Sequence, residues 1–404
     1  LDGLTKELSQ AVEVVSGAHA NGWRELRTLL FKARPTHIVH AMLLSDADDT
    51  ANHCGQACAT LCEVAQALHS CLSSAGAAVP MLAPVLLCVR YEAVTSLESA
   101  IEYEGGGAAM ASSLCKALSA ELPALTRCAT VHVPRGTSAS WIGARIAVEM
   151  GDGCGLDMDV AYDATGRRSV RRYRSVGAEL PAALQGSEGG TVLRPRCAHV
   201  VSGGLGGLGS AVVRLLLGDE ASEGCSVLVI GRRPVEQAHA RMRELGWGER
   251  VAYAQVDLGA DYATLVGAIA DHLRRSDQPL GAVFHLAGGY SRVPVAELSA
   301  AALSDATRAK VWGAIHLHRA AAEVGGRPAF VHFGSVASVY AGTGLGAYAA
   351  ANAFLEWFAR WQRDVARLDA RTIEWASWGG VGISERDETL GMASWLAPLP
   401  LELG

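Results

Sequence analysis

A glycine-rich segment near the middle of the chain limits what the second half can fold into. It follows the β-branched run Ala198–Ser202 and precedes a helical pattern over Ser210–Leu217, and it contains the spacing GxGxxG. Glycines at this spacing allow a tight turn, the approach of a pyrophosphate and the close packing of helix on strand. The sequence therefore predicts a dinucleotide-binding loop, formed by Gly203, Gly204, Leu205, Gly206, Gly207, Leu208 and Gly209.

Around this loop, short β-branched runs alternate with longer helical patterns. This alternation is typical of βαβ units and predicts a doubly wound α/β fold, a parallel sheet with helices on both faces. The expected strands are Ala198–Ser202, Ser226–Gly231, Val251–Val256, Ala282–Leu286, Ala329–Phe333 and Arg371–Ala376.

The first half carries the same rhythm more weakly, and we expect a second, degenerate Rossmann-like αβ layer there. No glycine loop follows its first strand, and the triple glycine Gly105–Gly107 is preceded by Glu102 and Glu104, which would repel an anion. We therefore expect this half to bind no nucleotide.

A polar, glycine-rich linker near residues 182–192 predicts a structural subdomain over residues 1–188 and a catalytic one over residues 189–404. The strands expected in the first half are Thr36–Met42, Val85–Arg90, Cys128–Val133 and Leu156–Tyr162, with helices near Ala51–Leu72 and Ala108–Leu122.

The charge and hydropathy of the chain exclude several classes of protein. A net charge of −6 with mixed signs gives no basic face, so nucleic acid is not an expected partner. The longest apolar run, Ala75–Val89, has fifteen residues and two prolines, whereas a membrane-spanning helix needs about 20 residues. The first residues show no secretory signal. We expect a cytoplasmic protein that does not enter a membrane.

The ten cysteines include no CxxC pair, which favours reduced, buried thiols over disulfides. His53, Cys54, Cys58 and Cys62 have helical spacing and could be metal ligands. However, the apolar residues around them indicate a core face, and we expect no metal.

Charged residues after two strands bear on the choice of cofactor. Arg232 and Arg233 follow the strand Ser226–Gly231, where an NAD-binding site would have an acidic residue for the ribose 2′-hydroxyl. Two guanidinium groups favour a 2′-phosphate instead, so NADPH is expected. Asp257 follows the strand Val251–Val256 and is interpreted either as a contact to the adenine or as a helix N-cap.

A tyrosine, a lysine and a serine could carry out ketone reduction by such a cofactor. Tyr348 could protonate the nascent alkoxide if a nearby cation lowered its pKa from about 10 toward neutral pH. A lowering of about three pKa units corresponds to ~4 kcal/mol, which an adjacent ammonium group can supply. Lys310 is the candidate cation. Ser335, 13 residues before the tyrosine at a strand end, could orient the carbonyl, and Ser338 is its competitor. Each of these residues alone could equally be structural; their joint placement favours function.

These segments together resemble the short-chain dehydrogenase/reductase superfamily, and more closely the ketoreductase domains of modular polyketide synthases. The resemblance is firm over residues 195–395 and looser over residues 30–180. In most of the superfamily a lysine follows the tyrosine by four positions, whereas in these ketoreductases lysine and asparagine exchange places, as Lys310 and Asn352 do here. The resemblance implies a tetrad of Lys310, Ser335, Tyr348 and Asn352, cofactor contacts at Ala287 and Gly288, and a non-catalytic first half.

The resemblance also implies a substrate and a stereochemical class. The Leu-Asp-Asp motif of one class is missing after Gly288, and Tyr340 stands where the opposite class usually has tryptophan, which favours the L-hydroxy (A-type) outcome. Met392 lies in a segment similar to the lid over nicotinamide and substrate.

The chain ends at Gly404, before a complete family domain would, and we expect a piece of a longer multienzyme. Its substrate would be a β-ketoacyl chain on an acyl carrier protein, with other polyketide synthase domains as neighbours. The alternatives are an NADPH-binding structural or epimerase module and a stand-alone reductase of ketones or fatty acyl chains.

Overall fold

The computed structural model describes residues 22–33, 35–43, 50–74, 84–91, 104–125, 127–151, 157–172, 193–218, 223–379 and 399. Within it the chain divides into two compact units. The first comprises residues 1–171, 291–306 and 336–358, and the second comprises residues 172–290, 307–335 and 359–404. The predicted subdomain boundary at residues 188 and 189 lies outside the described residues.

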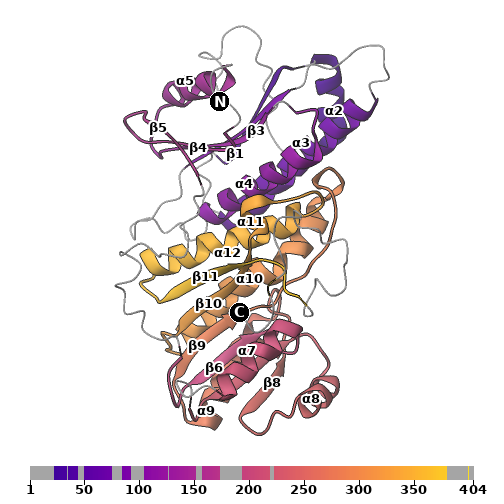
Figure 1. Ribbon diagram of the computed structural model, residues 1–404. Coiled ribbons are helices and arrows are strands. Elements are labelled where there is room, and N and C mark those ends of the chain that lie inside the picture. Colours follow the sequence, from indigo (N-terminus) through magenta and orange to yellow (C-terminus); the bar gives the residue numbers. More distant parts are fainter. Residues whose placement is uncertain are drawn as a thin grey trace. The chain divides into compact units, whose positions relative to one another are not determined.

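The first unit contains a five-stranded sheet (Figure 1) in the order β1-β2-β3-β4-β5. Neighbouring strands are parallel except β4 and β5, which are antiparallel. The strands are β1 (His37–Leu43), β2 (Val85–Tyr91), β3 (Arg127–Val133), β4 (Asp159–Tyr162) and β5 (Arg168–Val170). The helices of this unit include α2 (Gly22–Ala33), α3 (Thr50–Ser74), α4 (Glu104–Glu121), α5 (Ala139–Met150), η3 (Val295–Glu297) and α11 (Ala337–Tyr340).

The two faces of this sheet differ in polarity. Successive side chains of a strand point to opposite faces. One face packs its apolar side chains, such as Leu87 and Val131, against Ile142 and Ile146 of α5. The other face carries a polar row, because the strand register pairs His40 with Cys88, Cys88 with Thr130, and Thr130 with Asp159.

The second unit contains a six-stranded, all-parallel sheet in the order β11-β10-β9-β6-β7-β8. Strand order reverses between β6 and β9, as in the doubly wound fold. The prediction of a doubly wound parallel sheet preceded by a second αβ layer is confirmed. The strands are β6 (Ala198–Ser202), β7 (Ser226–Gly231), β8 (Val251–Gln255), β9 (Leu280–His285), β10 (Ala329–Ser335) and β11 (Ala370–Trp375). The helices between them are α7 (Gly207–Gly218), α8 (Val235–Glu244), α9 (Tyr262–Ser276), α10 (Ala300–Glu323) and α12 (Gly346–Asp364), of which the last two continue into the first unit.

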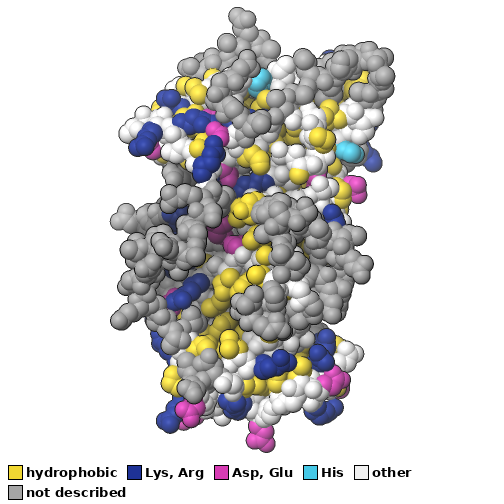
Figure 2. Space-filling model, in the orientation of Figure 1, with side chains coloured by type: hydrophobic (Ala, Val, Ile, Leu, Met, Phe, Trp, Pro, Cys, Tyr) yellow, Lys and Arg dark blue, Asp and Glu magenta, His cyan; other side chains and the backbone are white. Residues whose placement is uncertain are grey.

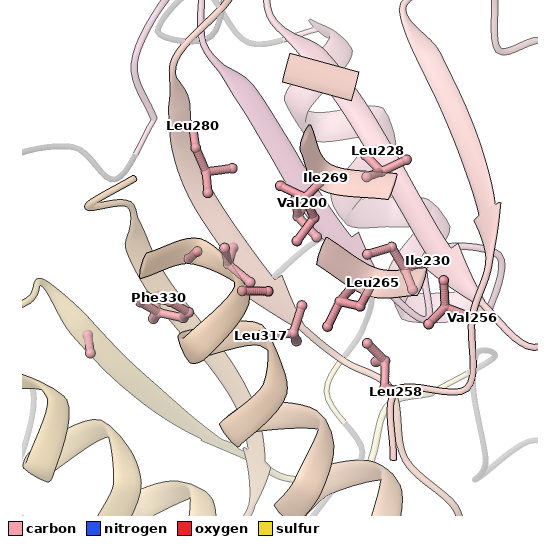
Figure 3. Close-up of a cluster of buried hydrophobic side chains, with 14 of the residues drawn as sticks. Val200, Leu228, Ile230, Val256, Leu258, Leu265, Ile269, Leu280, Leu317 and Phe330 are labelled. Atoms are coloured by element: carbon pink, nitrogen blue, oxygen red, sulfur yellow. The ribbon is translucent and has the colours of Figure 1, made fainter. Parts of the chain in front are cut away.

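Helices cover both faces of the second sheet because its strands are apolar on both sides. On one face Val200, Leu228 and Ile230 pack with Ile269 of α9 and Leu317 of α10, as Figure 3 shows. On the other face the alternate strand residues Val201, Val227 and Val229 pack with helices α7 and α8. The helix residues in this cluster include Val213 and Leu216 of α7 and Met242 of α8. This two-sided burial fixes β6 at the centre of the sheet and thereby fixes the loop that follows it.

The structure bears on three further expectations from the sequence, which concern the surface charge, membrane-spanning helices and a metal site. Basic and acidic side chains both occur on the face shown in Figure 2. None of the helices in the described ranges is long and apolar enough to span a bilayer. Cys58 and Cys62 are buried in α3, and the described residues contain no group of three or more side chains suited to hold a metal ion. His53 and Cys54 lie in a part of α3 whose side chains are outside the described residues.

Candidate active site

The loop between β6 and α7 is shaped by three of its glycines. Gly203 has φ +73°, and a β-carbon on it would lie 3.1 Å from the backbone nitrogen of Ala287. A β-carbon on Gly204 would lie 2.9 Å from Val229 Cγ1, and one on Gly209 would overlap the carbonyl oxygen of Gly203. Any other residue at these positions would push α7 away from β6 or block the turn. The structure therefore explains why the segment needs glycine at these three positions.

This loop presents backbone amides at the N-terminus of α7. Gly206 and Gly207 are exposed, while Leu205 and Leu208 are half-buried. The first amides of a helix have no partners within the helix and carry its positive dipole end, so they suit a phosphate group. The loop residues thus fit a dinucleotide pyrophosphate.

Ser202, the last residue of β6, ties this loop to the end of β9. Its hydroxyl accepts hydrogen bonds from the backbone nitrogens of Leu286 (3.1 Å) and Ala287 (3.2 Å) and lies 2.8 Å from His285 Nδ1. We did not single out Ser202 in the sequence. The only available signal was a buried hydroxyl immediately before the glycines, where it can bridge two strand ends.

The basic residues after β7 are placed at the surface. Arg232 and Arg233 are both exposed. The hydroxyl of Tyr253 on β8 donates to the carbonyl oxygens of Gly231 (2.9 Å) and Arg233 (2.7 Å), which fixes the backbone of this turn. The two guanidinium groups are therefore free to reach a ligand while their backbone is held, and they fit a 2′-phosphate.

Asp257 is not the helix N-cap that the sequence offered as one of its two roles. Helix α9 begins at Tyr262, and Asp261 is its N-cap residue. The carboxylate of Asp257 instead accepts from the backbone nitrogen of Gly259 at 3.0 Å and lies 3.4 Å from Arg308 of α10. Asp257 therefore stabilises the turn after β8. Its contact with an adenine ring stays a prediction.

Lys310 is a buried cation on α10. Its side chain is 6% exposed, and Nζ donates a 2.7 Å hydrogen bond to the carbonyl oxygen of Phe333 on β10. Burial lowers the pKa of Lys310 to about 8, although the negative charge of Glu374 acts in the other direction and raises it. Its aliphatic stem passes Gly288 so closely that a β-carbon there would lie 2.7 Å from Lys310 Cε. An ammonium group is thus held near the end of β10 instead of in solvent.

Ser335 ends the strand that accepts this hydrogen bond. It is 3% exposed and lies two residues after Phe333. The structure thereby brings Lys310 and Ser335 to the same end of β10. Ser338, its competitor, belongs to α11 in the first unit, where its carbonyl oxygen accepts from Ser113 of α4 at 2.9 Å.

Tyr348 and Asn352 lie one turn apart on α12. Asn352 is fully buried, and its Nδ2 donates to the carbonyl oxygen of Tyr348 at 2.8 Å. Within the described part of the chain, Asn352 Oδ1 has no hydrogen-bond partner. A buried amide oxygen without a partner is costly, so this oxygen is suited to receive a donor from a ligand or water.

Of the two residues that the sequence connected with stereochemistry, the structure describes Tyr340 but not Met392. Tyr340 ends α11 and is 52% exposed, so its ring is accessible. Met392 and most of the predicted lid lie outside the described residues.

The six-stranded parallel sheet and the glycine loop between β6 and α7 are those of a Rossmann-like fold of the short-chain dehydrogenase/reductase type. The KR-domain family model matches residues 197–380. Residues 197–380 are therefore similar to the ketoreductase (KR) domains of modular polyketide synthases, a family that implies oxidoreductase activity.

Curated relatives and solved structures agree with this family. Polyketide synthase GfsA of Streptomyces halstedii is 36% identical over 54% of this chain, and erythronolide synthase EryA3 of Saccharopolyspora erythraea is 34% identical over 45%. The matched segments are only 3% and 6% of the lengths of those proteins. The first ketoreductase of the tylosin polyketide synthase has a TM-score of 0.71 and 25% identity, covering 100% of this chain and 82% of that one. An A1-type ketoreductase, at 24% identity, has a TM-score of 0.71 and shares the fold over 99% of this chain and 81% of its own.

Proposed function

We propose that this chain reduces a β-ketoacyl thioester, carried on an acyl carrier protein, to the β-hydroxyacyl thioester with NADPH. The observation that carries the proposal is the buried ammonium group of Lys310, held at the end of β10 where Ser335 lies. A cation held in this position is suited to stabilise a negative charge that develops beside it. The glycine loop after β6 belongs to the same unit.

The cofactor would be held by the loop and by the turn after β7. NADPH, when bound, supplies the hydride. Gly203, Gly204 and Gly209 allow the tight turn and the close packing of α7 on β6, and the first amides of α7 would bind the phosphate oxygens of its pyrophosphate. Arg232 and Arg233 would bind the 2′-phosphate and thereby favour NADPH over NADH. In this proposal Ala287 and Gly288 lie along the cofactor, which their fixed backbone beside Ser202 supports.

The proton for the nascent alkoxide would come from the phenol of Tyr348. Lys310 would stabilise the phenolate that remains, and Ser335 would donate to the substrate oxygen and orient the carbonyl. Asn352 would accept a hydrogen bond at Oδ1 from a donor in the same site. The support for this role is that Oδ1 is buried and has no hydrogen-bond partner among the described residues. These roles follow the lysine and asparagine exchange seen in the sequence.

The relatives support the substrate class and the partner. The matched proteins include polyketide synthases, and one of the structural neighbours is an A1-type ketoreductase. We therefore propose an acyl carrier protein and adjacent synthase domains as partners, and an L-hydroxy product. Tyr340 would contact the substrate from α11 in place of the usual tryptophan, and Met392 would contact it from the lid.

The test is to incubate the purified chain with NADPH and a diketide thioester, to follow cofactor oxidation, and to determine the configuration of the alcohol. We expect turnover and the L-hydroxy product. Ser335→Ala should lower kcat by about 100-fold, whereas Ser338→Ala should retain most of the activity. No oxidation of NADPH by a chain that binds NADPH would overturn the proposal, and equal losses in the two serine variants would overturn the role of Ser335.

A further inference from the structure

A buried group of charged side chains in the first unit plays no part in the proposed reaction. Arg90 lies at the carboxyl end of β2, and the strand register places it opposite His132 on β3. Both belong to the polar face of the five-stranded sheet. Asp159 at the start of β4 and Lys116 on α4 lie on the same side of that sheet. The carboxyl ends of parallel strands are where doubly wound folds bind ligands.

Most of these charges neutralise one another. Lys116 Nζ lies 3.0 Å from Asp159 Oδ2, and Ser112 donates to the other oxygen of that carboxylate at 2.5 Å. Arg171, beyond β5, lies 4.0 Å from Glu356 on α12. After these two pairs are formed, the positive charge of Arg90 remains.

The negative charge of Asp159 acts on the buried guanidinium group of Arg90, but the two groups do not form an ion pair. Arg90 is 6% exposed, and its Nε and Nη2 both donate to His132 Nε2, at 3.3 and 3.0 Å. Within the described residues, no carboxylate oxygen lies within ion-pair distance of its guanidinium group. Burial, and secondarily the charge of Arg90, lowers the pKa of His132 to about 4, so this imidazole is neutral at pH 7. Burial lowers the pKa of Arg90 to about 10, so the guanidinium remains a cation.

The hydrogen bonds to His132 leave one side of the guanidinium group available. A guanidinium has five N–H donors, of which Arg90 uses two on His132. Apart from His132, none of the described residues accepts a hydrogen bond from the edge formed by Nη1 and Nη2, and such an edge can donate two parallel hydrogen bonds, the arrangement that recognises carboxylates and phosphates. A buried cation with an unused bidentate edge is strongly favoured to bind an anion.

We propose that Arg90 forms an oxyanion-binding site at the carboxyl edge of the five-stranded sheet, taking a carboxylate or a phosphate group. Arg90 binds the two oxygens of the anion through its Nη edge, and His132 holds the guanidinium in position. Lys116, which is paired with Asp159, adds no net charge to the site, and Asp159 disfavours anions of high charge. This site does not depend on the proposed ketoreductase activity.

The test uses the full chain with the dinucleotide loop kept occupied. Calorimetric titration with inorganic phosphate, and separately with acetate, is carried out at constant ionic strength with saturating NADP⁺ present. We expect saturable binding of at least one of them, and the stronger of the two defines the ligand class. If the chain binds no NADP⁺, the Arg232→Gln/Arg233→Gln variant removes the competing basic turn instead. Absence of saturable binding by the wild-type chain overturns the proposal.

Three variants locate the site. Arg90→Gln should weaken anion binding by about 10-fold or more, and Arg90→Lys should weaken it less because it keeps the charge but loses the bidentate edge. Arg241→Gln, which changes an exposed arginine on α8, should bind as the wild type does. If Arg90→Gln does not fold, the comparison of Arg90→Lys with the wild type decides the question. Unchanged affinity in Arg90→Lys and in Arg90→Gln would assign the anion to another site.

Discussion

The side chain of Lys310 passes over Gly288 with no room for a β-carbon, which would lie 2.7 Å from Lys310 Cε. The glycine after β9 therefore determines the path of the lysine stem, and the stem in turn delivers the ammonium group to the carbonyl oxygen of Phe333. Two residues that are distant in the sequence are thus coupled by packing alone.

Replacing Gly288 should consequently impair the lysine. In Gly288→Ala the stem must move, the hydrogen bond to Phe333 lengthens, and kcat should fall about 10-fold or more, which corresponds to about 1.4 kcal/mol. Gly289→Ala is the matched control, because a β-carbon on Gly289 meets no atom within 4 Å. Steady-state rates of the two variants test this coupling. Equal rates would show that the contact with Gly288 does not position Lys310.

The burial of Lys310 predicts how the reaction depends on pH. Burial lowers the pKa of Lys310 to about 8, so the protonated fraction falls as pH rises through that value. If the ammonium group supports Tyr348, kcat/KM should decline above pH ~8. In Lys310→Arg the cation persists, so the part of the decline that is due to residue 310 should be absent, and any decline that remains reflects loss of the Tyr348 proton. A wild-type profile that is flat to pH 10 would separate Lys310 from proton transfer.

The crowding at Gly209 predicts a loss of cofactor binding. A β-carbon on Gly209 would overlap the carbonyl oxygen of Gly203, so Gly209→Ala should displace the start of α7 and weaken NADPH binding by 100-fold or more. Gly218→Ala, at the other end of the same helix, meets no atom within 4 Å and should bind NADPH normally. Fluorescence titration with NADPH measures both, and circular dichroism verifies that each variant is folded.

The two exposed arginines after β7 should determine the choice between NADPH and NADH. Arg232→Gln/Arg233→Gln removes both cations from the turn that Tyr253 holds. The affinity for NADPH should drop by 10-fold or more, while the affinity for NADH should change little, because only NADPH carries the 2′-phosphate. The ratio of the two dissociation constants is the measurement. An equal loss for both cofactors would point to damage of the turn instead.

Much of the second unit could be predicted from local pattern. The limits of β6 and β7 are those expected, because each is a β-branched run bounded by glycine or polar residues. Strand β10 extends two residues beyond the predicted Phe333, since Gly334 and Ser335 pair with Glu374 and Trp375 of β11. That pairing depends on a strand distant in sequence, and no local signal reveals it.

The first unit and the details of the site were harder to predict. Helix α5 was not predicted, although Ser138 caps it by accepting from the backbone nitrogen of Trp141 at 3.2 Å. Strand β5 has three residues, with no apolar alternation to mark it. In the site, the sequence indicated Lys310 but could not indicate its acceptor, because a backbone carbonyl has no residue type. The surroundings of Gly288 likewise exist only in the folded chain.

The buried histidines predict a loss of stability in mild acid. Burial lowers the pKa of His40 in the first unit and of His332 in the second to about 4, from the ordinary value of 6.5. The folded state then keeps these imidazoles neutral while the unfolded chain takes up protons below pH 6.5. Their contribution to stability is therefore complete above pH 6.5 and is lost as pH falls from 6.5 toward 4. Each group contributes a slope of at most about 1.4 kcal/mol per pH unit.

Urea unfolding at a series of pH values between 7 and 5 measures this slope. His40→Gln should lower the slope by the contribution of one proton, because glutamine does not titrate and can still bond to Thr60, whose Oγ1 lies 2.9 Å from His40 Nε2. His239→Gln on α8 is the matched control: this histidine is exposed, so the slope should remain that of the wild type. If the two variants show the same slope, the acid sensitivity arises from groups other than the buried imidazole of His40, such as the carboxylates paired around Glu149.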